Sequence, residues 1–90
     1  MSENNLPFTQ TKLSYNSFIR KFDMNTDPKS FVWHRDKEDR IVEAVENTNW
    51  LFQIDNQLPI KIEGEIFIPK NTFHRIIKGD GDLKVKVQKL

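Results

Sequence analysis

Two histidines and one aspartate are the residues of this 90-residue chain whose side chains and spacing best suit a metal ion. His34 and Asp36 lie two positions apart, and His74 is the only other histidine. On a β-strand, residues two apart share a face with their Cα atoms about 6.6 Å apart, so His34 and Asp36 can approach one ion. Imidazole and carboxylate groups both bind Fe, Mn, Ni and Zn. The three residues indicate one divalent metal site; the alternative is that no metal binds and each histidine is satisfied by hydrogen bonds.

The charged residues near this set decide how well it can hold a cation. Arg40 follows Asp36 by four positions, and its guanidinium stays protonated at any ordinary pH. If Arg40 points inward and pairs with Asp36, metal affinity should collapse; if it points outward, a three-ligand site remains open. Glu38 and Asp39 fit a solvated turn, because runs of charge usually face solvent.

Three residues are expected to contact a small-molecule ligand. Arg40 is one, as a cation beside the metal set. Gln53 lies on the strand face opposite the aromatic stripe of residues 50–55, where it can line a cavity. Trp33 can stack on a sugar or aromatic ring at a barrel mouth. The sequence identifies no catalytic residue.

Short apolar or alternating runs, separated by turn residues, predict an all-β fold. Residues 83–89 alternate apolar residues with Lys or Gln, which is typical of a strand with one buried face. The predicted strands cover residues 17–24, 30–36, 40–46, 50–55, 58–62, 65–68, 72–78 and 83–89. Many short strands joined by tight turns indicate a sandwich or a barrel. We expect an N-terminal arm or edge strand over residues 1–16 and one barrel domain over residues 17–90.

Composition limits the partners and the compartment. Fourteen Lys and Arg residues against 13 Asp and Glu leave a net charge of +1, so no excess charge is available to hold nucleic acid. The absence of cysteine is compatible with a reducing compartment. The sequence contains neither a signal peptide nor a membrane-spanning run, so we expect a cytoplasmic protein without a membrane partner. A chain this short buries a limited core, and we expect a homodimer.

Two segments of the sequence resemble the motifs of one large family. The spacing Gly64-x4-Pro69-x4-His74 resembles the second conserved motif of the cupin superfamily. Residues 33–36 lie where the first cupin motif places a His-x-His pair. The resemblance is closest to small RmlC-like cupins of bacteria and tailed phages. It implies a double-stranded β-helix, or jelly-roll barrel, with His34, Asp36 and His74 pointing inward near one mouth.

The sequence also departs from the family pattern. Asp36 stands where cupins that hold a metal well carry a second histidine, and Arg40 or Ile41 stands where they carry a glutamate. These departures favour a degenerate metal or ligand site, in a module for small-ligand binding or assembly. The alternative is a metal-dependent enzyme of the dioxygenase or sugar isomerase type that uses His34, Asp36 and His74 as a two-histidine, one-carboxylate triad.

Overall fold

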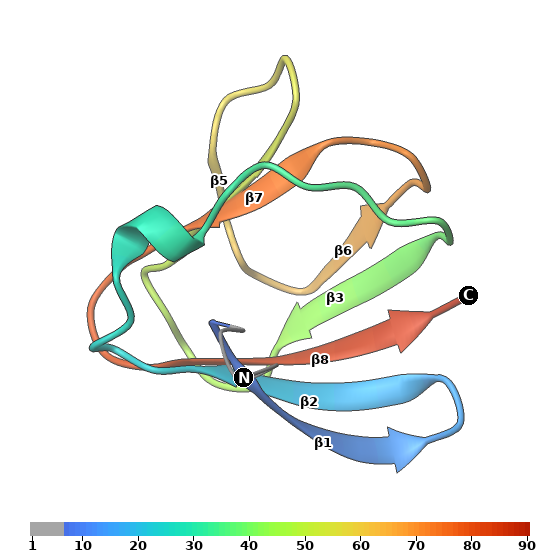
Figure 1. The fold of residues 1–90 in the computed structure, drawn as a ribbon, viewed down its shortest axis with the longest axis horizontal. Coiled ribbons are helices and arrows are strands. Elements are labelled where there is room, and N and C mark those ends of the chain that lie inside the picture. The colour runs from blue at the N-terminus through green and yellow to red at the C-terminus, as the bar shows by residue number, and fades with distance from the viewer. Residues whose placement is uncertain (1–6) are drawn as a thin grey trace, which may run out of the picture.

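Short antiparallel strands form almost all of the regular structure in this computed structural model, which describes residues 7–90 (Figure 1). The strands are β1 (Thr9–Ser14), β2 (Ser17–Phe22), β3 (Arg40–Ala44), β4 (Leu51–Ile54), β5 (Ile60–Lys61), β6 (Glu65–Ile68), β7 (His74–Ile77) and β8 (Leu83–Lys89). One 3-10 turn, Pro28–Ser30, lies between β2 and β3. The predicted all-β jelly-roll architecture is confirmed. The first six residues of the predicted arm lie outside the described residues.

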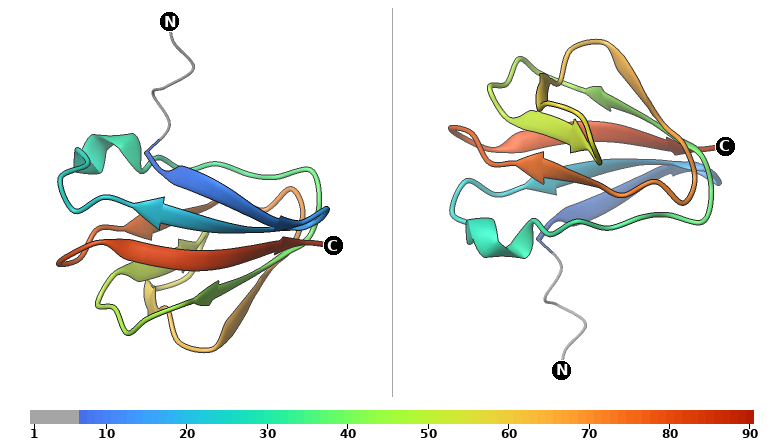
Figure 2. Two further views of the ribbon diagram at one scale, coloured as in Figure 1. Left: turned by 90° about the horizontal axis from the view of Figure 1, so that it is seen from below. Right: turned by 90° about the horizontal axis from the view of Figure 1, so that it is seen from above.

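The strands form two sheets that face each other, as the two views of Figure 2 show. One sheet has the order β1-β2-β8-β3-β6, and the other has the order β5-β4-β7. β8 pairs with β2 on one side and with β3 on the other, so that Val85 lies opposite Arg20 and Val87 lies opposite Val42. Residues directly opposite each other in a ladder project from the same face. Arg20 therefore shares the inner face of its sheet with apolar side chains.

The space between the sheets is filled by apolar side chains around a fully buried tryptophan. Trp50 is 0% exposed, and its indole Nε1 donates to the carbonyl oxygen of Gly81 at 3.1 Å. That bond satisfies the single polar group of the side chain. The other buried apolar residues are Phe22, Phe52, Ile62, Ile66, Ile68, Leu83, Val85 and Val87. Across residues 7–90, no helix has the length and apolar character needed to cross a bilayer.

The segment between β2 and β3 differs from its prediction as a strand over residues 30–36. Asp27 caps the 3-10 turn by accepting a hydrogen bond from the backbone N–H of Lys29 at 3.0 Å, and Ser30 ends that turn. From Phe31 the chain runs as a loop, in which only His34 forms a β-bridge, to His74. Because the turn redirects the chain, it meets the edge of β7 at a single residue instead of along a strand.

Several strands are shorter than the apolar pattern predicts. The run over residues 17–24 ends at Phe22, because the chain then turns, with the backbone N–H of Thr26 donating to the carbonyl of Asp23 at 3.0 Å. The run over residues 58–62 contributes only the two residues of β5. These shortened ends lie at turns, where local hydrogen bonds compete with the sheet ladder.

Candidate metal centre

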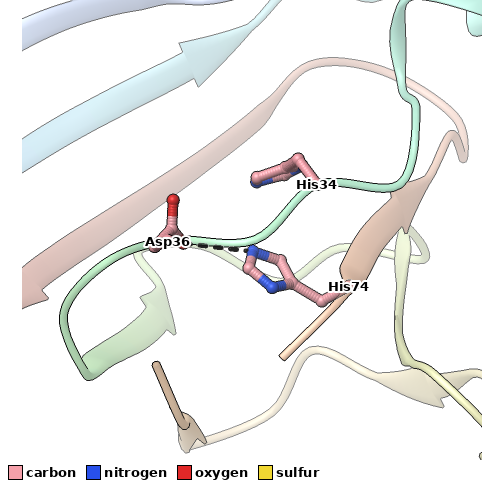
Figure 3. Close-up of side chains that lie close together, drawn as sticks. All are labelled: His34, Asp36 and His74. Atoms are coloured by element: carbon pink, nitrogen blue, oxygen red, sulfur yellow. Dashed lines mark ion pairs between the residues drawn. The ribbon is translucent and has the colours of Figure 1, made fainter. Parts of the chain in front are cut away.

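The two histidines are brought together by backbone pairing between a loop and β7 (Figure 3). The backbone N–H of His34 donates to the carbonyl of His74 at 3.0 Å, and the N–H of His74 donates to the carbonyl of His34 at 2.9 Å. Their imidazole rings pack edge to face, with centroids 4.2 Å apart. His74 is 5% exposed, whereas His34 lies on the exposed side of the pair. A single pair of hydrogen bonds thus fixes which way both rings point.

Asp36 is held in place by the turn that follows β6. The backbone N–H of Asn71 donates to the carbonyl of Asp36 at 2.7 Å, and Asn71 adopts a left-handed backbone conformation with φ 59°. Asparagine tolerates that conformation better than most residues. Nearby, the N–H of Lys70 donates to Asp39 Oδ1 at 2.8 Å. The loop carrying His34 and Asp36 is therefore tied to both ends of the segment that leads into His74.

Three potential ligand atoms converge from His34, Asp36 and His74, all within 4.8 Å of one another. His34 Nδ1 lies 3.3 Å from the carbonyl oxygen of Val32, and His74 Nδ1 lies 2.9 Å from that of Thr72. A carbonyl oxygen only accepts hydrogen bonds, so each Nδ1 carries the proton. Each Nε2 is then left with a lone pair, and metal-binding histidines are commonly oriented by such a bond.

The contact between His74 and Asp36 lacks a donor. Asp36 Oδ2 lies 3.4 Å from His74 Nε2 and is buried without any hydrogen-bond partner among residues 7–90. Burial lowers the pKa of His74; the charges of His34 and Arg40 lower it further, while the bond to Thr72 and the charge of Asp36 raise it. A neutral imidazole with its proton on Nδ1 cannot donate to Asp36, so two acceptors face each other. A cation between them supplies the missing positive charge, and the residues therefore fit a divalent metal.

Arg40 points inward and reaches Asp36, but by the other carboxylate oxygen. Its Nη2 lies 3.4 Å from Asp36 Oδ1, and its Nε donates to Glu38 Oε2 at 2.8 Å. The shorter bond is to Glu38, and that bond is the main reason why the pKa of Glu38 is lowered. Glu38 thus neutralises Arg40, instead of standing free in a solvated turn as predicted. The inward direction of Arg40 meets the condition under which we expect weak metal affinity. Its pairing uses only Oδ1, however, and Asp36 Oδ2 remains available as a third ligand atom.

The convergent group lies beside a cavity of about 350 Å³ between the sheets. His34, Asp36, His74, Arg40 and Arg20 supply nearly all of its charged and polar lining. Most of the remaining wall is apolar, with Phe22, Phe52, Val42, Ile62, Ile66, Ile68, Ile76, Leu83, Val85 and Val87 among its residues. An apolar pocket with a few convergent polar groups is the usual form of a small-molecule site.

Gln53 and Trp33 do not line this cavity, in contrast to the prediction. Gln53 alternates with the buried Phe52, and its Oε1 accepts from Arg75 Nε at 2.9 Å. The guanidinium of Arg75 in turn lies over the ring of Trp33, 4.7 Å from its centroid. The period of the strand therefore places this cluster on the outer face of the sheet. Arg75 points away from the cavity, as alternation from His74 predicts.

Among the charged and titratable residues that line the cavity, Arg20 is the one that the sequence did not predict. It lies on β2 between Phe18 and Phe22, which share its face of the strand. The sequence contained one signal for it, a basic residue between two aromatic residues on the same face of a predicted strand.

Several solved structures have folds similar to that of this chain. DddQ, a DMSP lyase from Ruegeria pomeroyi, matches with a TM-score of 0.73 and 13% identity, over 92% of this chain and 46% of that chain. An RmlC-like cupin from Shewanella frigidimarina matches with a TM-score of 0.64 and 12% identity, over 91% of this chain and 73% of that chain. The iron(II) form of HppE matches with a TM-score of 0.61 and 11% identity, over 82% of this chain and 41% of that chain.

The fold and the site together define a small cupin-fold barrel with a two-histidine, one-carboxylate group, as the resemblance implied. The chain spans between 36% and 46% of the length of the DMSP lyases and HppE that it matches. At these identities the likeness establishes the fold alone. No protein-family model matches the chain, and no curated protein matches it.

Proposed function

We propose that this chain binds one divalent transition metal and uses the adjoining cavity to bind a small organic ligand next to it. His34 Nε2, His74 Nε2 and Asp36 Oδ2 would hold the ion. The observation that carries the proposal is the buried Asp36 Oδ2, which has no donor within residues 7–90 and faces an imidazole that cannot supply one. Leaving a buried carboxylate oxygen unpaired is costly, and a metal ion removes that cost.

Each residue around the group has a defined task in this proposal. The carbonyls of Val32 and Thr72 keep the proton on each Nδ1, so that both Nε2 atoms stay available. Glu38 holds Arg40 toward Asp36 Oδ1 and limits its repulsion of a cation. The apolar wall excludes water from the bound ligand. When bound, a metal with three protein ligands and open positions supplies Lewis acidity or oxygen activation.

Catalysis on the bound ligand is the stronger form of this proposal. Similar folds occur in a DMSP lyase and in the iron(II) form of HppE, both enzymes. A second candidate is a metal-free binding module, favoured by the 3.4 Å contact of Arg40 with Asp36. In that case the guanidinium takes the place of the ion as the counter-charge of the carboxylate.

Metal analysis of protein made without a histidine tag tests the proposal. We expect one metal per chain after reconstitution with Fe(II), Mn(II), Ni(II) or Zn(II). At about 100 times the dissociation constant, the metal should stabilise the fold by about 2.7 kcal/mol. Asp36→Asn and His74→Ala should each weaken binding by about tenfold or more, a loss of about 1.4 kcal/mol. Glu63→Gln, which changes an exposed carboxylate before the start of β6, at the opposite end of that strand from the turn that holds Asp36, should bind like the unaltered protein.

Two results would contradict the proposal. One is no stoichiometric metal together with an unchanged melting temperature in the presence of all four ions. The other is metal binding that is equally strong in Asp36→Asn, which keeps the shape of the side chain but not its charge. Circular dichroism of each variant establishes that the β-structure is intact.

A further inference from the structure

Within residues 7–90, the second arginine of the cavity, Arg20, has no acidic partner. It projects from β2 on the same face as Val85 of β8, and it lines the cavity together with the metal group. Its Nε donates to Gln10 Oε1 at 2.7 Å, and its guanidinium lies over the ring of Phe8, 4.4 Å from the centroid. Both partners are neutral. Through the described part of the chain, every ion pair of an arginine involves Arg40, and none involves Arg20.

The environment of Arg20 is unfavourable for a cation that has no counter-charge. Burial is the main cause that lowers the pKa of Arg20, and the charge of Arg40 lowers it further, whereas the charges of Asp36 and Glu38 raise it. A guanidinium nevertheless remains protonated in proteins. Arg20 therefore places a partly desolvated positive charge at a cavity wall, and no carboxylate of residues 7–90 forms an ion pair with it.

The acidic side chains near the cavity are paired with Arg40 and not with Arg20. Asp36 and Glu38 both contact Arg40, and a neutral His74 adds no charge. A bound divalent metal would add further positive charge to the cavity. An anionic group on the ligand supplies the counter-charge of Arg20, and a planar guanidinium binds a carboxylate through two parallel hydrogen bonds.

We propose that Arg20 binds the carboxylate of a small organic acid, whose apolar part packs against the cavity wall beside Phe22 and Val85. This inference names the ligand class of the cavity in the proposed function, but it does not require a metal to be bound. The stacking of Phe8 on the guanidinium and the hydrogen bond that Arg20 Nε donates to Gln10 fix the direction of Arg20 and leave its terminal nitrogens for the acid. The wall selects the apolar part by size and shape, and Arg20 selects acids over neutral molecules.

Titration of the full chain with matched acids and amides tests this inference. Butyrate and benzoate are compared with butyramide and benzamide by calorimetry, with EDTA present throughout so that no metal contributes. We expect at least one acid to bind about tenfold or more tightly than its amide. Arg20→Met should abolish this preference, whereas Arg20→Lys should keep part of it. Lys21→Gln, on the next residue of the same strand and exposed, should behave like the unaltered protein.

The same variants separate this inference from the metal proposal. Arg20→Met should keep the metal stoichiometry of the unaltered protein, because Arg20 is not a ligand. Equal binding of acids and amides, binding of neither acid, or an unchanged preference in Arg20→Met would overturn the role of Arg20. Loss of metal binding with a retained acid preference would overturn the metal proposal alone.

Discussion

Asp36 divides its two carboxylate oxygens between different neighbours. Oδ1 faces Arg40 at 3.4 Å, and Oδ2 faces His74 at 3.4 Å. Since Arg40 also bonds Glu38 at 2.8 Å, its charge is shared between two carboxylates. One aspartate can therefore lie beside a cation of the protein and still offer an oxygen to a metal ion.

The buried imidazole of His74 predicts a pH dependence of stability. Burial lowers its pKa in the folded protein, whereas the unfolded chain has an ordinary histidine pKa of about 6.5. As pH falls below about 6.5, the unfolded chain takes up a proton that the folded protein resists, so the metal-free protein loses stability. The loss continues until the pH reaches the lowered folded-state pKa. Well above pH 6.5 this group adds no pH dependence.

Urea unfolding in EDTA measures this effect. As the pH is lowered from about 7 to about 5.5, the unfolding free energy should fall. His74 should contribute at most about 1.4 kcal/mol per pH unit to this slope, the value for one proton. His74→Gln should show a shallower slope than the unaltered protein. Parallel slopes in the two proteins would show that His74 does not titrate differently in the folded state.

For single residues, the sequence predicted that His34, Asp36 and His74 converge but did not predict the contacts of the residues around them. The spacing of His34 and Asp36 and the motif at His74 were sufficient to predict that the three meet. The partners of Arg40 depend on side-chain direction in a loop, which no periodicity encodes. Gln53 lies outside the cavity because the apolar stripe next to it, not Gln53, occupies the inner face of β4.

Among the secondary-structure elements, the turn between β7 and β8 is packed against the start of β4. A Cβ atom on Gly79 would lie 2.7 Å from the backbone nitrogen of Trp50 and 2.8 Å from the carbonyl carbon of Asn49. These are backbone atoms, so the clash cannot be relieved by a side-chain rotation. Gly64 differs, because its φ is 63° but no atom lies within 4 Å of an added Cβ.

The same substitution at these two glycines should therefore have different costs. Gly79→Asn should destabilise the fold by about 1–3 kcal/mol, the range of overpacked sites. Gly64→Asn should cost less, because asparagine tolerates positive φ and the space is open. Chemical denaturation of both variants measures the difference. Equal costs would contradict this explanation, because of these two glycines only Gly64 has a positive φ and only Gly79 approaches the backbone of β4 closely.

Strand prediction from the sequence succeeded where alternation is strong and failed where a local turn intervenes. Residues 83–89 were predicted as they are found, because every second residue of β8 is buried. Residues 30–36 were predicted as a strand from their composition, but the capped turn at Asp27 redirects the chain. Local hydrogen bonding thus outweighed β-propensity in this segment.

For the whole molecule, β1 is the feature that predicts assembly. All six of its residues are exposed, and it forms one edge of the five-stranded sheet. Leu13 and Tyr15 beside that edge are 54% and 88% exposed. An exposed strand edge is a template for pairing with another chain. We predict a homodimer that pairs through β1.

Light scattering over a range of concentrations measures the mass of the particle. We expect twice the 10.7 kDa of one chain. Leu13→Glu should shift the equilibrium toward monomer, and Leu58→Glu, at an 83% exposed position away from β1, should not. A monomer at all concentrations, or equal effects of the two variants, would contradict pairing through β1.

The sequence predicted the overall architecture but not the order of the strands. Alternation and turn residues indicated a barrel, and the motif resemblance indicated which barrel. The placement of β3 between β8 and β6 joins segments far apart in the chain. Such pairing depends on the closure of the whole barrel and leaves no local pattern.

The reciprocal backbone bonds between His34 and His74 carry a consequence for biosynthesis. A nascent chain that has emerged only as far as β6 carries His34 and Asp36 but lacks the strand that orients them. If the chain binds a metal as proposed, the complete set of ligands forms only after β7 has left the ribosome and docked. The third ligand then arrives together with the fold that orients the other two.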